Sequence, residues 1–287
     1  MNLRTAALTL CALIAFASNS VLTRLALGSG EIDAATFTAL RLSSGAIVLM
    51  FLVRDRRALW RAGGSGWREA LALFAYAAPF SFAYLRIGAA AGALVLFGVV
   101  QLTMIGYAFV RGERPAVITW IGVALALTGL ATLTLPAVTR LDTRGVLLMT
   151  IAGIAWASYS LAGRKSGEPL VTNARSFLWS TGLAVVLLLF MHDTAFATPR
   201  GIALAAISGG ITSALGYAIW YRALPRLSVT QAAVAQLAVP IIAAIAAVVL
   251  LNERLTTRLI VSGACVLAGV ALAVIRRSRN VSARASV

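Results

Sequence analysis

Long apolar segments separated by short polar ones run along the whole chain. A helix that crosses the hydrocarbon core of a bilayer needs roughly 20 apolar residues, and the chain contains ten segments of about this length. Only a tight turn within residues 87–92 separates the third segment from the fourth. The predicted spans cover residues 5–27, 34–53, 69–86, 88–110, 115–135, 145–163, 176–192, 201–221, 229–251 and 257–275.

Composition supports lipid as the solvent of these segments. Of the 287 residues, 60% are hydrophobic and 12% are charged, whereas a soluble domain is nearer half apolar and a quarter charged. A single core of this size cannot bury that apolar excess. The sequence therefore predicts an all-α integral membrane protein with ten transmembrane helices. Both cysteines, Cys11 and Cys265, lie in apolar segments, and we expect no disulfide, metal or cofactor.

The chain has a net charge of +16. Its basic residues lie between the apolar segments and do not form one patch, so they indicate membrane topology and not a nucleic-acid partner. With the N-terminus inside, the inner segments hold 17 of the 25 basic residues and the outer ones hold 6. Cytoplasmic loops carry such an excess. The alanine and arginine richness is typical of bacteria. We predict a multi-pass protein of the bacterial inner membrane, with both termini in the cytoplasm.

The chain repeats itself at an offset of 140 residues. Residues 14–24 and 154–164 carry the same residue at six positions, and Phe16 is matched by Trp156. The pattern Glu113-Arg114-x7-Gly122-x6-Gly129 recurs from Glu253 with Ser262 in place of the first glycine. This duplication divides the chain into residues 1–140 and 141–287, with five spans each. An odd number of spans inverts the second copy, which is the plan of secondary transporters with a substrate site near the midplane.

These features resemble the drug/metabolite transporter superfamily, in its ten-helix branch with two EamA-type repeats. The resemblance rests on the small-Asn-Ser segment at residues 18–20 with Arg24 after it, on Arg41 in the second span, on the Glu-Arg turn at Glu113 and on Pro240. It implies that spans one, three, four, six, eight and nine surround a central cavity, with spans five and ten outside. The bacterial exporters of amino acids, including aromatic ones, are the most similar group. One departure is Val100, which occupies the position in the first repeat that matches Pro240.

Aromatic and amide side chains inside the inner spans are the candidate substrate contacts. Tyr76, Phe80 and Tyr84 follow one stripe of a helix, and an amide in hydrocarbon needs a partner or a water-filled cavity. The amides could equally serve as hydrogen bonds between helices. Tyr84, Trp220 and Tyr221, near span ends, are expected to anchor at the membrane interface. The predicted substrate-binding residues are Phe16, Asn19, Ser20, Tyr76, Phe80, Gln101, Trp156, Tyr159, Tyr217 and Gln236.

Two prolines and one arginine lie within predicted spans. Pro79 and Pro240 each leave a carbonyl four residues earlier without its helical donor, so they are candidate hinges, or kinks that serve packing alone. Arg41 is the one clearly intramembrane charge. Such a residue is by default a candidate functional site. It could receive a substrate carboxylate or phosphate, or it could serve structure by bonding backbone carbonyls or extending to water.

All nine acidic residues fall in loops or at span ends, so no carboxylate is placed to carry a proton or to pair with a cationic drug. The chain has no metalloprotease motif and one peripheral histidine, which disfavours a membrane enzyme. A sensor would need a soluble output domain, which the loops are too short to form.

The sequence predicts a secondary transporter that exports small neutral or zwitterionic metabolites, foremost aromatic or hydrophobic amino acids, by alternating access. The alternative is an organic-anion or sugar-phosphate carrier that uses intramembrane arginines. Facilitated diffusion and proton antiport both fit the absence of a membrane acid, and a monomer is the simplest expected assembly.

Overall fold

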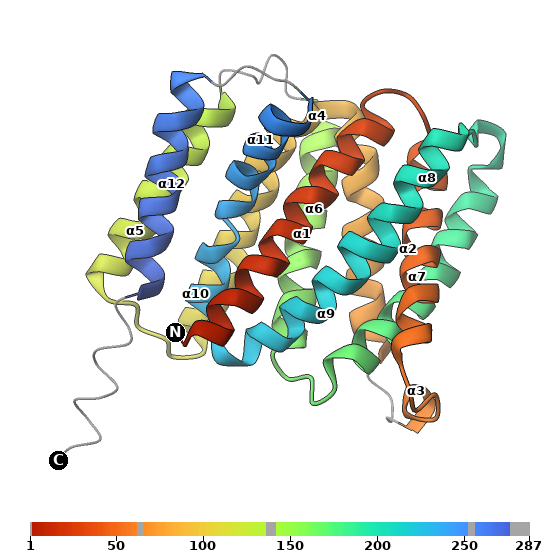
Figure 1. Cartoon of the computed structure of the whole chain (residues 1–287), viewed down its shortest axis with the longest axis horizontal. Coiled ribbons are helices and arrows are strands. Elements are labelled where there is room, and N and C mark those ends of the chain that lie inside the picture. Colours follow the sequence, from red (N-terminus) through yellow and green to blue (C-terminus); the bar gives the residue numbers. More distant parts are fainter. Residues whose placement is uncertain (1, 62–65, 136–141, 252–255, 276–287) are drawn as a thin grey trace.

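The computed structural model describes residues 2–61, 66–135, 142–251 and 256–275, and within these ranges the chain is a bundle of helices joined by short loops (Figure 1). The first half holds α1 (Leu3–Leu27), α2 (Ala34–Leu52), the short α3 (Ala58–Arg61), α4 (Gly66–Val110) and α5 (Val117–Thr134). The second half holds α6 (Thr143–Gly163), α7 (Pro169–Phe190), α8 (Pro199–Ile207), α9 (Ala214–Ala223), α10 (Val229–Ala235), α11 (Ala238–Leu251) and α12 (Thr257–Ile275).

The described part of the chain holds nine helical stretches that are long and apolar enough to cross a membrane. The longest, α4, has 45 residues, which as a straight helix would extend about 68 Å. A bilayer core is about 30 Å thick. Gly88, with φ 68° and ψ 178°, divides α4 into two limbs, and only glycine adopts such a φ readily. The two limbs are spans three and four, so the predicted tight turn and the count of ten spans are confirmed.

One predicted span boundary was wrong, and one predicted span is not a single regular helix. Span seven starts at Pro169 and not at residue 176, because the polar residues of its first turns bond inside the protein. Asn173, for example, is fully buried and donates to the carbonyl of Pro169 at 2.7 Å. Span eight is not one regular helix: a π-helical segment, Ser208–Ser213, joins α8 to α9. Hydropathy alone detects neither feature.

The repeated glycine motif forms the contact between spans five and ten. A Cβ on Gly122 would lie 2.5 Å from the carbonyl oxygen of Gly269, and one on Gly129 would lie 2.9 Å from that of Ser262. Since Gly122 matches Ser262 and Gly129 matches Gly269 at the 140-residue offset, the two contacts are related by a twofold exchange of the copies. The pairs run in opposite directions along the two helices, which is the geometry of an inverted repeat. Figure 1 shows α5 and α12 side by side at one edge of the molecule.

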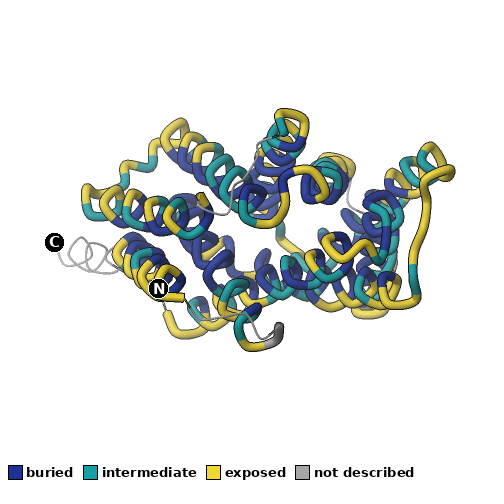
Figure 2. Tube along the Cα trace, turned by 90° about the horizontal axis from the view of Figure 1, so that it is seen from above, coloured by how far each residue is buried: buried dark blue, intermediate teal, exposed yellow. Residues whose placement is uncertain are grey.

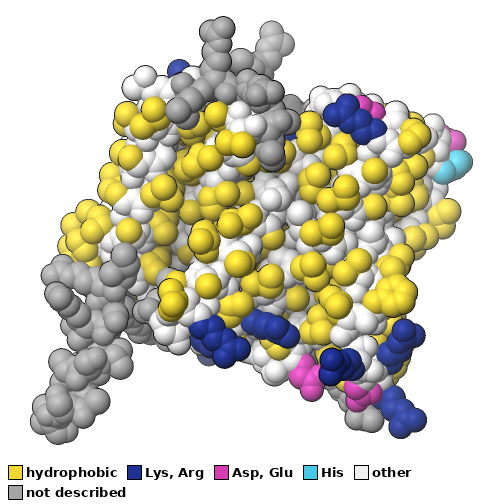
Figure 3. Space-filling view, viewed as in Figure 1, with side chains coloured by type: hydrophobic (Ala, Val, Ile, Leu, Met, Phe, Trp, Pro, Cys, Tyr) yellow, Lys and Arg dark blue, Asp and Glu magenta, His cyan; other side chains and the backbone are white. Residues whose placement is uncertain are grey.

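The outer surface is apolar and the interior carries the polar groups. Seen along the helices, buried positions face inward and exposed positions face outward (Figure 2). Hydrophobic side chains cover the face shown in Figure 3 between two rims, and arginine and lysine side chains gather along the lower rim, where α1 begins. We call this rim the basic end. The exposed large apolar side chains on the described helices include Ile47, Phe51, Leu102, Leu147, Val186, Leu189, Phe190, Val249 and Ile260.

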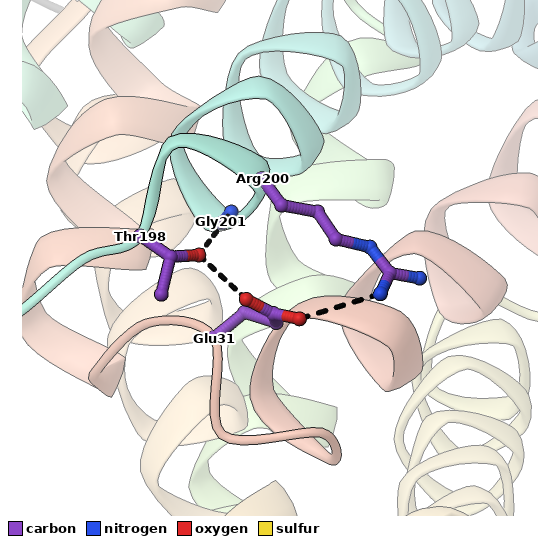
Figure 4. Close-up of polar contacts among 4 residues, drawn as sticks. All are labelled: Glu31, Thr198, Arg200 and Gly201. Atoms are coloured by element: carbon purple, nitrogen blue, oxygen red, sulfur yellow. Dashed lines mark hydrogen bonds and ion pairs between the residues drawn. The ribbon is translucent and has the colours of Figure 1, made fainter.

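At the end opposite the basic end, polar contacts join the loop after α1 to the segment before α8. Thr198 Oγ1 donates to the Glu31 carboxylate at 2.6 Å and also accepts from the backbone of Gly201, while Arg200 contacts Glu31 at 3.4 Å (Figure 4). A backbone bridge between Ile32 and Ala197 reinforces the connection.

On the same end, the Arg86 guanidinium donates to Asp142 at 3.0 Å and holds the pKa of that carboxyl below its usual range. Asp142 also caps α6 by accepting from the backbone of Arg144. The pair therefore fixes the start of α6 to the end of the first limb of α4.

Candidate functional site

A cavity of about 220 Å³ lies in the half of the molecule away from the basic end. Both limbs of α4 contribute to its wall, together with α1, α5, α6 and α11, and the exposed Arg24 lies at its rim. Most of the wall is apolar, so the few polar groups stand out. The lining residues are Ser20, Val21, Arg24, Phe80, Tyr84, Ala89, Ala90, Gly92, Ala93, Leu96, Phe97, Leu133, Thr134, Met149, Pro240, Ala243, Ala244 and Ala247.

A second, deeper pocket of about 30 Å³ adjoins this cavity. The two share Ser20, Phe80, Leu96 and Phe97 as lining residues. Eight of the ten predicted substrate-binding residues line the deeper pocket. They come from α1, the first limb of α4, α6, α9 and the junction of α10 with α11, so segments far apart in the sequence meet here: Phe16, Asn19, Ser20, Tyr76, Phe80, Trp156, Tyr217 and Gln236.

Trp156 is the centre of the aromatic wall. Its ring centroid lies 4.9 Å from that of Tyr76 and 4.9 Å from that of Tyr217. Phe16 presents its edge to Trp156 at 5.2 Å, with the planes at 90°. Edge-to-face and tilted contacts of this kind are the favourable ones for aromatic rings. The wall is thus a packed cluster that joins four spans, with one flank open to the pocket.

Gln236 lies where span nine is interrupted between α10 and α11. Its Oε1 accepts from the indole Nε1 of Trp156 at 2.6 Å, and its Nε2 donates to the carbonyl of Ala232 at 3.0 Å. Pro240 has no N–H to offer the Gln236 carbonyl, and that carbonyl instead accepts from the backbone of Val239 at 3.0 Å. The backbone carbonyl at the interruption therefore keeps a hydrogen bond, through a tighter turn than in an α-helix. The interruption also places the buried Gln236 side-chain amide in the pocket wall.

Asn19 connects span one to the π-helical segment of span eight. Its Oδ1 accepts from Ser208 Oγ at 2.5 Å and from Thr212 Oγ1 at 3.4 Å. A Cβ on Gly209 would lie 1.9 Å from the carbonyl oxygen of Arg41, so only glycine allows span eight to approach α2 this closely. π-helical turns often occur at functional sites, and this one lies directly beside the pocket wall.

Arg41 is buried, with 1% of its surface exposed. Its Nε donates to Ser213 Oγ at 3.0 Å, and its Nη2 donates to the hydroxyls of Tyr217 at 2.7 Å and Tyr76 at 3.4 Å. The sequence suggested two structural roles for Arg41, bonds to backbone carbonyls or extension to water. Extension to water is wrong, because the side chain is buried. The side chain bonds hydroxyls instead of backbone carbonyls. Arg41 stands behind two tyrosines of the pocket wall.

At the basic end, side chains close the space below the pocket. Gln101 Nε2 donates to the carbonyl of Ala233 at 2.6 Å, which joins α4 to α10. Glu113 caps α10: its two oxygens accept from the backbone of Val229 at 2.9 Å and from the hydroxyl of Thr230 at 3.0 Å. A carboxylate at a helix N-terminus is favourable. The Glu-Arg turn thus has a structural role that its sequence pattern did not reveal.

Arg164, the repeat counterpart of Arg24, makes a similar closure between spans six and eight. Its Nη1 donates to the carbonyls of Leu224 and Leu227 beyond the end of α9. Cations near the last carbonyls of a helix complement its dipole. Hydrogen bonds therefore join the ends of spans four and nine, and those of spans six and eight, at the basic end. The cavity lies in the opposite half of the molecule.

Several predicted residues lie elsewhere. Tyr159 donates to Asn173 at 2.8 Å and is not among the pocket-lining residues, and neither is Gln101. Pro79 lies inside α4 and does not line either space. Residues 252–255 are not among those that the structure describes, so the predicted repeat of the Glu-Arg turn at Glu253 lies outside the described residues.

The expected interfacial anchors are inside the protein, so that prediction was wrong. Trp220 and Tyr221 are fully buried, and Tyr221 donates to the carbonyl of Tyr159 at 2.8 Å. Tyr84 lines the cavity. Position near a span end does not distinguish the lipid face of a helix from its inner face. Leu96, Phe97 and Val239 were missed because an apolar side chain carries no chemical signal in an apolar sequence.

Within the described ranges, no group of three His, Cys, Asp or Glu side chains could hold a metal ion. Two buried polar atoms close to these spaces have no hydrogen-bond partner: Tyr84 Oη, on a residue of the cavity wall, and Arg41 Nη1, behind the tyrosines of the deeper pocket. Buried polar groups are normally paired, so these atoms mark places where a ligand or water would be accommodated.

Comparisons with known proteins agree with this architecture. Residues 143–275 match the EamA-like transporter family. The chain is 46% identical over 269 residues to Uncharacterized protein PA1977 of Pseudomonas aeruginosa, with 94% of each chain covered. It is 26% identical over 289 residues to an Uncharacterized transporter of Archaeoglobus fulgidus, with 95% of this chain and 98% of the other covered. A solved structure titled "Crystal structure of protein" superposes with a TM-score of 0.82 at 20% identity, covering 96% of this chain and 98% of the other, and so has the same fold.

The fold and these relatives together define a multi-pass membrane transporter. The chain belongs to the EamA-like transporter family of the drug/metabolite transporter superfamily. Its predicted membership is thereby confirmed, while the resemblance to exporters of aromatic amino acids stays a prediction.

Proposed function

We propose that this protein is a secondary transporter that exports small neutral or zwitterionic metabolites, foremost aromatic or hydrophobic amino acids. The observation that carries the proposal is the pocket between the spans, whose wall combines the rings of Phe16, Tyr76 and Trp156 with the amide of Gln236. Ligand pockets of this kind are mostly apolar, with a few polar groups that fix orientation. No described lining residue of either space is acidic, which disfavours a cationic substrate.

The mechanism that we propose is alternating access between two repeats, residues 1–140 and 141–287. A cavity in one half of the molecule and bonded span ends in the other are what one end-state of such a cycle requires. The interruption around Gln236 and Pro240 is the proposed hinge. Rotation of α10 there would separate it from Gln101 and Glu113 and open the pocket toward the basic end.

We further propose that the basic end faces the cytoplasm of a bacterial cell, so that the cavity faces outward in this state. The support is the positive-inside rule, applied to exposed arginines such as Arg54, Arg57 and Arg111. A reporter that is active only in the cytoplasm, fused after Val287, tests this orientation. Activity supports it, whereas activity of a reporter that works only outside the cytoplasm would reverse it.

The pocket is formed by one chain, which supports a monomer as the working unit. Its partners in this proposal are the substrate and the lipid bilayer, without a cofactor. The alternative, a carrier of organic anions or sugar phosphates, has its support in Arg41 and in Arg24 at the cavity rim. A substrate panel separates the two functions.

The test is uptake into proteoliposomes that contain the purified full chain, with labelled phenylalanine and tryptophan. Competitors are threonine, a sugar phosphate and a quaternary ammonium compound, each with and without an imposed pH gradient. Saturable amino-acid flux supports the proposal, and its dependence on the gradient distinguishes antiport from facilitated diffusion. Sugar-phosphate flux in the absence of amino-acid flux would replace the proposal with the alternative.

A further inference from the structure

The buried guanidinium of Arg41 lacks a countercharge among the described residues. None of the ion pairs found in those ranges includes it, and its hydrogen-bond acceptors are the neutral hydroxyls of Ser213, Tyr76 and Tyr217. Removing an uncompensated charge from water carries a large free-energy penalty. An arrangement that retains such a charge beside a pocket favours an anionic group as the pocket's occupant.

The positive charge is presented to the pocket through two tyrosines. Arg41 Nη2 donates to both hydroxyls, at 2.7 Å for Tyr217 and 3.4 Å for Tyr76. A hydroxyl that accepts a hydrogen bond keeps its own proton for donation, and a cationic donor behind it strengthens that donation. Both tyrosines line the deeper pocket, so the two reinforced hydroxyls belong to residues of its wall.

The guanidinium has spare donor capacity as well. Arg41 Nη1 is buried and has no hydrogen-bond partner in the described structure. The guanidinium carbon also lies 5.5 Å from the centre of the Tyr76 ring, so the charge is close to the pocket wall. The unpartnered Nη1 is independent of the two hydroxyl bonds, and it indicates the same kind of ligand.

We propose that Arg41, Tyr76 and Tyr217 form a carboxylate-binding subsite, so that the preferred substrates carry a carboxylate next to an apolar group. This inference rests on the proposed function and names the group by which the substrate is held. The hydroxyls of Tyr76 and Tyr217 donate to the carboxylate, and Arg41 acts through them as a positioning residue. The apolar group extends into the adjoining cavity of about 220 Å³.

The single guanidinium favours a carboxylate over a phosphate ester. A carboxylate carries one negative charge, which one buried cation balances. A phosphate monoester carries close to two at neutral pH, and the deeper pocket has no basic side chain among its described lining residues that could add to the charge of Arg41 behind its wall. The test must therefore distinguish binding of phosphate esters from binding of carboxylates.

The experiment measures binding to the purified full chain in detergent by calorimetry. Its three probes share a phenyl ring: phenylacetate, the isosteric neutral phenylacetamide, and phenyl phosphate. The wild-type protein is expected to bind phenylacetate about tenfold more tightly than the amide, in line with discrimination by paired polar groups. The double variant Tyr76→Phe/Tyr217→Phe keeps both rings and removes both hydroxyls, and it is expected to lose this preference.

A matched control is Tyr107→Phe. Tyr107 also bonds an arginine, since Arg111 donates to its hydroxyl at 3.0 Å, but the pair is exposed at the end of α4. This variant is expected to keep the full preference. Arg41→Lys keeps the charge without the paired geometry and is expected to retain only part of it; if that variant does not fold, the tyrosine pair decides.

Equal binding of phenylacetate and phenylacetamide by the wild type, or an unchanged preference in the tyrosine double variant, overturns the subsite. Tighter binding of phenyl phosphate than of phenylacetate overturns the assignment to carboxylates. Because binding is measured apart from flux, a carboxylate preference without amino-acid transport would sink the proposed function and leave the subsite intact.

Discussion

The indole Nε1 of Trp156 in α6 donates to the Oε1 of Gln236, between α10 and α11, at 2.6 Å. This bond links spans six and nine in the centre of the bundle, with Gln236 fully buried and Trp156 5% exposed. It joins the aromatic wall of the pocket to the interrupted span that we propose as the hinge. The same amide reaches Met104 Sδ at 3.4 Å, so span four is included in the contact.

Trp156→Phe is expected to weaken this link and to reduce phenylalanine uptake about tenfold. The ring remains, but the Gln236 acceptor loses its donor, which costs about 1–3 kcal/mol at a buried site. The double variant Trp156→Phe/Gln236→Leu removes the orphaned acceptor too, so its loss of thermal stability in detergent should be less than the sum of the single losses. Additive losses would show that the two side chains do not depend on each other. Trp120→Phe, on the surface of α5, is the control.

Pro240→Ala is expected to lower transport without lowering thermal stability. Alanine restores an N–H that can bond the Gln236 carbonyl, now held by Val239, and so favours one continuous helix through the interruption. Initial uptake rates in proteoliposomes measure the effect. Pro225→Ala, in the turn after α9, should leave those rates unchanged. Wild-type rates in the Pro240 variant would remove the hinge from the mechanism.

Glu113→Gln is expected to open the basic end more often. The carboxylate caps α10 through Val229 and Thr230, and losing an anionic cap costs about 1 kcal/mol. A cost of that size changes the ratio of two states about fivefold. The measurement is the alkylation rate of a cysteine placed at the buried position of Ala233, with Cys11 and Cys265 replaced by alanine.

Glu168→Gln serves as the control for this cap. Glu168 occupies the N-cap position of α7 but makes no side-chain cap hydrogen bond. Alkylation should proceed at the original rate in that variant. A Glu113 variant that reacts no faster than this control would mean that the cap does not hold the basic end closed.

Gly209→Ala is expected to destabilise the fold by about 1–3 kcal/mol, as overpacking does. The added Cβ would lie 1.9 Å from the Arg41 carbonyl oxygen and 2.1 Å from Ser44 Oγ, so α2 and span eight must separate. Gly182→Ala in α7 meets nothing within 4 Å and should be neutral or slightly stabilising. Melting temperatures in detergent compare the two, and equal values would contradict the close packing at Gly209.

The sequence predicted those features of the fold that depend on the composition of a whole segment or on a repeated motif. Ten apolar lengths, the turn at Gly88 and the repeated glycine motif of spans five and ten follow from hydrocarbon thickness, backbone freedom and duplication. The aromatic and amide composition also led to most of the pocket wall. These signals are local in sequence or recur at a fixed offset, so no knowledge of packing is needed to detect them.

Pairings between distant side chains were beyond such reasoning. Arg41 meets Ser213 and Tyr217, more than 170 residues away in sequence, and Glu113 caps a helix that starts 116 residues later. The burial of Trp220 depends on which face of α9 turns inward, because it donates to Ser160 on α6. Large apolar side chains occur on the lipid-facing and the inward-facing surfaces alike, so hydropathy does not separate the two.

Counterflow in proteoliposomes tests the central claim most directly. Liposomes that contain the purified full chain are preloaded with a high concentration of unlabelled phenylalanine and diluted into a trace of labelled phenylalanine. A carrier that alternates between two ends of one pocket is predicted to accumulate label transiently above its equilibrium level, and Trp156→Phe should reduce that overshoot. Label that rises to equilibrium without an overshoot, or does not enter at all, would contradict the account.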